Sequence, residues 1–179
     1  MNSELAKLNP TALDYFKKEL DLLKDVSLKS LIYNALAVAP QSFHDDEETQ
    51  EIVKSAFYIL KGILEARNVE GTVKDAMLGT VLLCDIMVNE FEDNMKDLHT
   101  VAVRKYLEDL RVDKDVQQQF WQNIMRGVES HEGPNGASPL LDSKPGTAEA
   151  EITYAFMIAR MKFVKLDWEV INNETGNKR

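Results

Sequence analysis

Asp85 lies in a part of the chain where an ionised side chain is unexpected. Residues 72–91, which include the run VLLCDIMV (81–88), are apolar almost all the way round a helix, so other helices are expected to enclose them. A lone carboxylate taken out of water costs several kcal/mol or more. Asp85 must therefore be hydrogen-bonded, paired with a cation, protonated or bound to a metal.

Two histidines offer Asp85 a chemical partner. The chain has three histidines, and His99 and His131 are expected at a helix start and a helix end, with a loop rich in glycine and proline after His131. Imidazole and carboxylate together form the ligand set of Zn, Mn or Fe ions. The sequence therefore predicts a metal site at Asp85, His99 and His131. The alternative is that Asp85 bonds to a backbone or cationic group or faces a water-filled cleft, and that each histidine caps carbonyl groups or faces water.

Amphipathic segments account for the elements that must position these side chains. Apolar residues recur at three- and four-residue spacing, and Asn9 followed by Pro10 is typical of a helix start. No alternation of period two competes, so we expect an all-α, single-domain bundle of about seven helices. These are residues 10–25, residues 28–38, a helix that follows a turn at 41–46 and runs to about Arg67, residues 72–91, residues 99–110, a helix capped by Asp113 or Asp115, and a last helix from Thr147 to Leu166.

The chain is expected to consist of one main helical domain with additional segments at its N- and C-terminal ends. Residues 1–38 are predicted to form N-terminal helices that pack on the core, residues 39–171 the main helical domain, and residues 172–179 a polar tail. Between the last two helices, residues 130–147 carry three of the five prolines of the protein. A loop of this composition is expected to be a lid or binding loop, with disorder as the alternative.

Composition excludes several classes of partner. The formal charge of −9 disfavours binding to a phosphate backbone, so no nucleic-acid partner is expected. No apolar run approaches the roughly 20 residues that span a bilayer, and the first residues do not resemble a targeting peptide, so no membrane partner is expected. The single cysteine, Cys84, cannot form an internal disulfide and suits a reducing compartment. These features predict a cytoplasmic protein.

Short segments in order along the chain carry a resemblance to a known family. They are APQSFH (39–44), VLLCDI (81–86), His99 with RKYL (104–107), VESHE (128–132) and residues 152–160, which end in IAR. The segment 81–86 resembles the buried helix of the HD-domain metal-dependent phosphohydrolases, which are named after an adjacent His-Asp pair, and the others are similar to parts of phage and bacterial members. The resemblance covers residues 39–166 and implies an HD-like fold with a metal centre.

The departures from this family matter for function. Where the family has its first histidine, the histidine of the pair and its closing aspartate, this chain has Glu48, Cys84 and Phe156. Phe156 cannot bind a metal, and its ring is expected to fill the space that the metal centre would occupy. Because Glu48 and Cys84 are possible ligands, a rearranged site of Glu48, Cys84, Asp85, His99 and His131 is the alternative to a site without turnover.

Three functions are open at this point. The first is a catalytically degenerate HD-like protein that binds a nucleotide or another phosphate ester, either to sequester it or to sense it. The second is an active metal-dependent phosphohydrolase, and the third is an interaction scaffold, most simply a homodimer. For the first function, the residues expected to contact the ligand are His44, Arg104, Arg126, Lys144 and Arg160. The alternative for each of them is an ordinary surface or capping residue.

Overall fold

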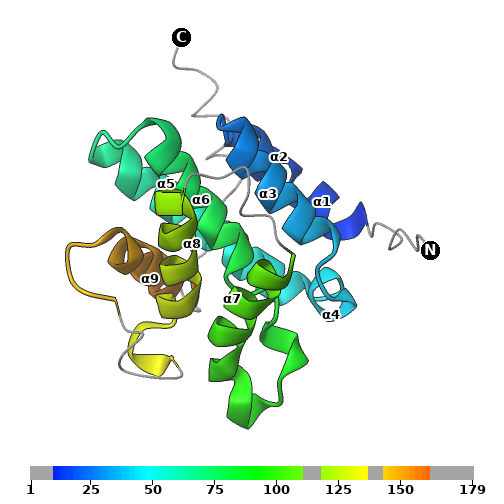
Figure 1. Cartoon of the computed structure of the whole chain (residues 1–179). Coiled ribbons are helices and arrows are strands. Elements are labelled where there is room, and N and C mark those ends of the chain that lie inside the picture. The colour runs from blue at the N-terminus through cyan, green and yellow to red at the C-terminus, as the bar shows by residue number, and fades with distance from the viewer. Residues whose placement is uncertain (1–9, 111–117, 137–142, 162–179) are drawn as a thin grey trace.

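The computed structural model describes residues 10–110, 118–136 and 143–161. Within these ranges the chain is helical and has no strand, which confirms the all-α prediction (Figure 1). The α-helices are α1 (Pro10–Tyr15), α2 (Lys17–Leu22), α3 (Val26–Ala37), α4 (Gln41–His44), α5 (Glu47–Ala66), α6 (Gly71–Leu83), α7 (His99–Asp109), α8 (Gln118–Ser130) and α9 (Ala148–Ala159). The described residues also form three short 3₁₀ helices, η1 (Val88–Glu90), η2 (Asp93–Leu98) and η4 (Gly133–Asn135).

The described residues form nine α-helices, where the sequence predicted about seven. The first predicted helix is two short helices, α1 and α2, which are interrupted at Phe16. The predicted turn after Pro40 contains the one-turn helix α4. Both differences arise because hydrophobic periodicity continues through a short break and does not report the backbone angles at one residue.

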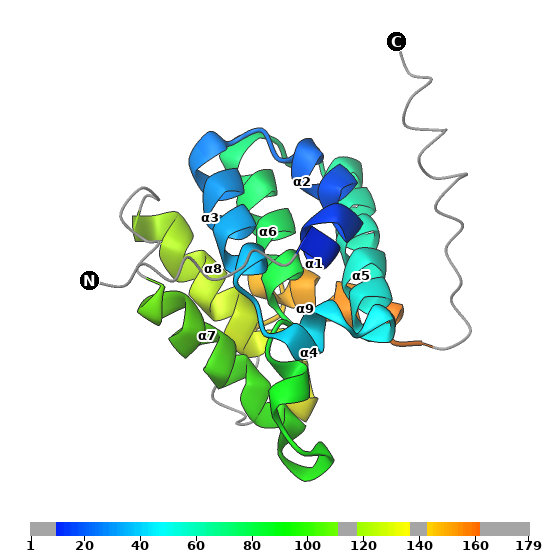
Figure 2. The ribbon, with the colours of Figure 1, turned by 90° about the vertical axis from the view of Figure 1, so that its right-hand side faces the viewer.

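Helix α6 runs through the middle of the bundle. It contacts α3, α5, α8 and α9, and all residues from Asp75 to Leu83 are buried, which confirms that this segment is enclosed (Figures 1 and 2). The prediction that one helix spans residues 72–91 is wrong, because α6 ends at Leu83 and residues 84–87 form turns. From Cys84 on, the amides bond to carbonyls three residues back, so the α-helical pattern gives way to tight turns. Asp85 therefore lies just after the helix.

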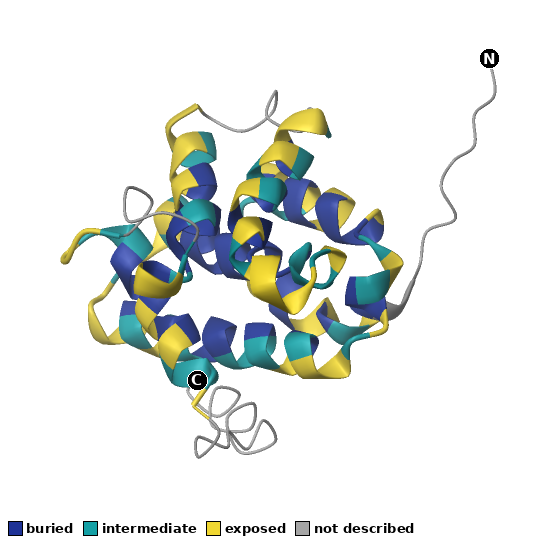
Figure 3. Ribbon diagram, turned by 90° about the horizontal axis from the view of Figure 1, so that it is seen from below, coloured by how far each residue is buried: buried dark blue, intermediate teal, exposed yellow. Residues whose placement is uncertain are grey.

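One hydrophobic core joins the elements. Phe16 of the N-terminal helices, Leu60 of α5, Leu82 of α6, Val128 of α8 and Phe156 of α9 belong to the same buried cluster. The buried residues line the inner faces of the helices, with exposed residues on the outside (Figure 3). The predicted boundary at residue 38 stays a prediction. The caps Asp113 and Asp115, Leu166 and the tail 172–179 lie outside the described residues, as do residues 137–142 of the predicted loop.

Helices α6 and α8 approach closely at Gly127. A Cβ atom placed on Gly127 would lie 2.6 Å from Cγ2 of Thr80 on α6, so any side chain at this position would force its neighbours to shift. The absence of a side chain therefore allows the two backbones to meet. This contact fixes the spacing between the C-terminal ends of α6 and α8, where Asp85 and His131 lie.

None of the described helices is both long and apolar enough to cross a lipid bilayer.

Candidate metal centre

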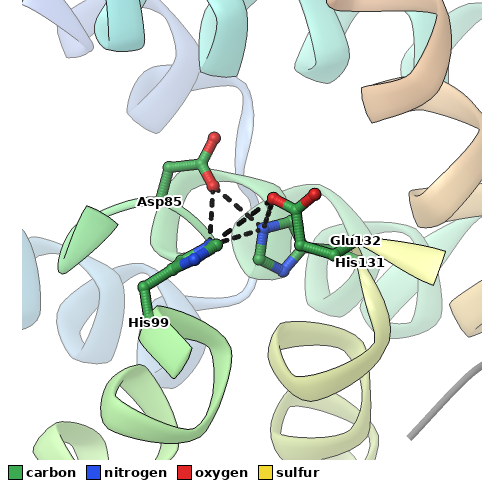
Figure 4. Close-up of side chains that lie close together, drawn as sticks. All are labelled: Asp85, His99, His131 and Glu132. Atoms are coloured by element: carbon green, nitrogen blue, oxygen red, sulfur yellow. Dashed lines mark hydrogen bonds and ion pairs between the residues drawn. The ribbon is translucent and has the colours of Figure 1, made fainter. Parts of the chain in front are cut away.

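Four side chains from three ends of helices meet inside the bundle. Asp85 lies in the turn after α6, His99 is the first residue of α7, and His131 and Glu132 follow the last residue of α8 (Figure 4). The predicted positions of the two histidines, one at a helix start and one at a helix end, are confirmed. Contacts of α8 with both α6 and α7 bring these ends together.

The ligand atoms of this cluster are spaced as ligands of a single ion would be. His131 Nε2 lies 2.9 Å from Asp85 Oδ1 and 3.1 Å from His99 Nε2, and His99 Nε2 lies 3.2 Å from Asp85 Oδ1. Glu132 Oε1 lies 3.5 Å from His131 Nε2 and 3.7 Å from His99 Nε2. All four atoms lie within 4.8 Å of one another. The buried cluster of Asp85, His99, His131 and Glu132 could thus hold a metal ion.

Backbone carbonyl groups fix the orientation of both imidazole rings. Nδ1 of His131 lies 2.8 Å from the carbonyl oxygen of Val128, and Nδ1 of His99 contacts the carbonyl oxygen of Lys96. A carbonyl oxygen only accepts hydrogen bonds, so each Nδ1 must carry a proton. In the neutral ring Nε2 is then an unprotonated acceptor, and in both histidines Nε2 faces the cluster. Metal-binding histidines are typically oriented by a hydrogen bond of this kind at the other ring nitrogen.

The centre therefore concentrates acceptors. With neutral rings, two imidazole nitrogens and two carboxylate oxygens point at one volume, and none of the four supplies a hydrogen atom. Side-chain exposure is 3% for Asp85, 2% for His99, 0% for His131 and 13% for Glu132, so water provides little compensation. Converging buried acceptors require a cation between them, and the two available cations are a proton and a metal ion.

Arg160 neutralises the carboxylates from the outer side. Its Nη2 donates to both oxygens of Asp85 at 3.1 Å, and its Nη1 donates to Oε2 of Glu132 at 2.6 Å. Asp85 is thus paired with a cation, which was one of the alternatives for this residue. With neutral imidazoles, two carboxylates and one guanidinium still leave the group with a formal charge of −1.

The ionisation of the centre follows from these contacts. Burial by itself would raise the pKa of Asp85, but the charge of Arg160 and the contacts with His131 and His99 outweigh it and hold that pKa well below its ordinary value. Burial opposes protonation of His131, yet the adjacent carboxylates of Asp85 and Glu132 raise its pKa well above the ordinary value. Without a metal, an imidazolium at His131 is accordingly the form that satisfies the cluster.

Phe156 forms an apolar wall of the centre. Its side chain is fully buried, and its ring centroid lies 4.9 Å from that of His131 and 5.1 Å from the guanidinium carbon of Arg160. The prediction that this ring points inward is confirmed, but the prediction that it fills the metal position is wrong, because the ring lies beside His131 while the ligand atoms converge on one another at 2.9–3.2 Å. The ring narrows the space around the ligands without contributing one.

Two predicted ligands lie outside the cluster. Cys84 is buried beside Asp85, but its thiol donates to the carbonyl oxygen of Thr80 at 3.3 Å, and burial raises the pKa of this thiol. Glu48 is exposed in the first turn of α5. Neither residue belongs to the group of converging ligand atoms.

Glu132 is the ligand that sequence reasoning missed. The only sequence feature that pointed to Glu132 is its position directly after His131, in the segment VESHE that resembles the family. An acidic residue after the end of a helix is ordinarily solvated, and only the turn of the chain into η4 brings this one inward.

The predicted phosphate contacts do not gather around the centre. Of the five, only Arg160 touches the cluster, and it does so through carboxylates. His44 is buried and its Nδ1 accepts a hydrogen bond from the Ala12 amide, and Arg104 pairs with Glu108 and Glu129. The two remaining residues, Arg126 and Lys144, are exposed.

No protein-family model, curated protein or solved structure matches this chain. Membership of the HD-domain family therefore stays a prediction, as do the nucleotide ligand, the homodimer and the cytoplasmic location.

Proposed function

We propose that this chain is a metal-binding protein whose buried centre holds one divalent transition-metal ion through Asp85, His99, His131 and Glu132. The observation that carries the proposal is the convergence of four acceptor atoms, two of them imidazole nitrogens whose opposite ring nitrogens are held by backbone carbonyls. An ion of charge +2 would convert the net formal charge of the group from −1 to +1 and give every acceptor a partner.

Zn²⁺ fits the number of ligands best among Zn, Mn and Fe. Bonds from Zn²⁺ to imidazole nitrogen or carboxylate oxygen are about 2.0–2.2 Å, which places the ligands of a tetrahedron about 3.3–3.6 Å apart. Five of the six separations in the cluster range from 2.9 to 3.7 Å. A hexacoordinate Mn²⁺ or Fe²⁺ ion accepts similar separations but needs two further ligands.

The surroundings of the centre favour binding over turnover. Structural zinc sites have four protein ligands, whereas catalytic sites keep a position for water or substrate. Here four protein ligands are available, Phe156 closes one side, and the ligands are nearly inaccessible to solvent. We therefore infer a closed centre that stabilises the fold around α6, α7 and α8.

A phosphate ester is the ligand that the family resemblance suggests for the protein as a whole. Arg160, with 30% of its side chain exposed, is the most accessible group at the centre and a good donor to phosphate oxygens. A panel of nucleotides tested against the metal-loaded protein should raise the unfolding temperature by several degrees for the true ligand. The absence of any shift across the panel would exclude nucleotides as the ligand class.

A metal-dependent phosphohydrolase is the second candidate, and the meeting of Asp85, His99 and His131 favours it. A bound metal would supply polarisation of a phosphoryl oxygen and a water of lowered pKa. Hydrolysis of a nucleotide or phosphodiester by the metal-loaded protein, lost in Asp85→Asn, would establish turnover and replace the binding-only function.

Metal analysis of the purified full chain tests the leading proposal. We expect about one Zn, Mn or Fe ion per chain, absent from Asp85→Asn and His131→Gln. Matched controls are Asp109→Asn, an exposed acid on α7, and His44→Gln, a buried histidine outside the cluster, and both should retain the ion. Wild-type protein that binds none of these metals, even when each is added to chelator-treated protein, would contradict the proposal.

A further inference from the structure

Arg160 holds the two carboxylates of the centre in one particular way. It follows the last residue of α9, and its two terminal nitrogens reach different acids, Nη2 to Asp85 and Nη1 to Glu132 (the acids are shown in Figure 4). The guanidinium group is planar, so both acids are bound by one rigid fork. The ring of Phe156 supports this fork, with its centroid 5.1 Å from the guanidinium carbon.

Each acid has an inner oxygen that faces the histidines and an outer oxygen that is bonded to Arg160. The inner oxygens, Asp85 Oδ1 and Glu132 Oε1, face the histidine nitrogens at 2.9–3.7 Å. The outer oxygens, Asp85 Oδ2 and Glu132 Oε2, are bonded to Arg160 at 3.1 Å and 2.6 Å, and Arg160 also donates to the inner Asp85 Oδ1 at 3.1 Å. Within the described residues the outer oxygens have no other partner.

We propose that Arg160 is the residue that determines metal selectivity at this centre, by limiting Asp85 and Glu132 to one coordinating oxygen each. This inference rests on the proposed metal-binding function. With the outer oxygens bonded to the guanidinium, the protein offers two nitrogens and two oxygens, a set that completes the shell of a tetrahedral Zn²⁺ ion. Arg160 touches the ligands and not the ion, so it is a positioning residue.

The same restriction disfavours larger, oxygen-preferring cations. Mn²⁺ is typically six-coordinate with oxygen ligands, and carboxylates can supply two oxygens each to such ions. If both acids could rotate and bind through two oxygens, the protein would offer six ligand atoms in place of four. Releasing the outer oxygens should therefore favour Mn²⁺ relative to Zn²⁺.

Competition with a chromophoric chelator, using Zn²⁺ alone and Mn²⁺ alone on the full chain, measures this selectivity. For Arg160→Gln we expect Zn²⁺ affinity to fall about 10- to 100-fold, the range for loss of a group that orients metal ligands, while Mn²⁺ affinity is unchanged or rises. The Zn²⁺/Mn²⁺ affinity ratio should then drop at least about tenfold. Co²⁺-loaded protein should change from the intense visible absorption of four-coordinate cobalt to the weak absorption of a higher coordination number.

Two further variants separate selectivity from structural damage. Arg67→Gln removes an arginine that pairs with Glu151 of α9 but has no contact with the cluster, and it should leave the affinity ratio unchanged. Arg160→Lys keeps the positive charge but has no planar group that can donate to both acids at once. It should therefore also lower the Zn²⁺/Mn²⁺ affinity ratio. It also serves as the test if Arg160→Gln does not fold.

Equal losses of Zn²⁺ and Mn²⁺ affinity in both Arg160 variants, with an unchanged Co²⁺ spectrum, would overturn this inference and leave the metal-binding function standing. A wild-type chain that binds neither ion would overturn both.

Discussion

Two buried aspartates, Asp75 and Asp85, lie ten residues apart and are satisfied in opposite ways. Asp75, within α6, accepts backbone hydrogen bonds from the amides of Lys24 at 2.7 Å and Asp25 at 2.6 Å. Asp85, just beyond α6, faces two imidazole nitrogens and shares an arginine with a second acid. Both carboxylates are equally hidden from water, so burial alone does not distinguish them.

The difference lies in what surrounds each carboxylate. Around Asp75 the partners are donors that cannot move or titrate, so that aspartate joins α6 to the start of α3. Around Asp85 three other side chains are themselves acceptors when the histidines are neutral. A buried acid indicates a functional site when other buried acceptors converge on it, beside any donor that it has.

The largest expected effect is that of Asp85→Asn. Metal binding should be lost. The free energy of unfolding of the metal-free protein should fall by about 3 kcal/mol, which is the low end for a broken buried ion pair, because Arg160 retains its ion pair with Glu132. Urea unfolding and metal titration of the same variant measure both quantities. Retained metal affinity would remove Asp85 from the ligand set.

Asp75→Ala should destabilise the protein without affecting the metal. Two amides of the α2–α3 connection would lose their acceptor, which costs about 2 kcal/mol in urea unfolding. Metal affinity, measured by the same titration, should stay within about twofold of wild type, because distant sites rarely couple. A large fall in affinity would mean that the two aspartates are not independent and would break the comparison.

Metal affinity should increase with pH. The raised pKa of His131 means that the metal-free protein keeps a proton at pH values above the ordinary histidine pKa of 6.5, and the metal must displace it. Each pH unit below the raised pKa should change the affinity by up to about tenfold, or about 1.4 kcal/mol, with proton release visible by calorimetry in buffers of different ionisation enthalpy.

The stability of the metal-free protein should change in the opposite direction. The contribution from His131 is complete below the unfolded-state pKa near 6.5 and is lost as the pH rises through the raised folded-state pKa. Affinity that is independent of pH would indicate that His131 is neutral in the metal-free state.

The smallest expected effects concern glycines. Gly127→Ala forces a Cβ against Thr80 and should cost about 1 kcal/mol, the low end for overpacking, because a methyl group of Thr80 is the first obstacle. Gly62→Ala, on α5 with nothing within 4 Å of the new Cβ, should stabilise by about 0.5 kcal/mol. The unfolding temperatures of the two variants measure this difference. Equal changes in unfolding temperature would contradict the close approach of α6 and α8.

The sequence predicted the parts of the centre that depend on residue type. An acid in an apolar stretch and only three histidines in the chain were enough to associate Asp85, His99 and His131. Hydrophobic periodicity likewise predicted helices whose ends carry both histidines.

What the sequence did not predict depends on backbone angles and long-range packing. The apolar run continues past Leu83, so the end of α6 is invisible to periodicity. The burial of Asp75 and Glu132 depends on contacts with residues far along the chain or on one turn. Arg160 was predicted as a phosphate contact because its charge is evident from sequence, whereas its pairing with Asp85 follows from how α9 packs.

Anomalous diffraction from crystals of the full chain loaded with Zn²⁺ tests the central claim most directly. A single peak should lie about 2.0–2.2 Å from Asp85 Oδ1, His99 Nε2, His131 Nε2 and Glu132 Oε1, with Arg160 on the outer oxygens. A peak at any other place in the chain, or none while the two imidazoles still share a hydrogen bond, would contradict the account.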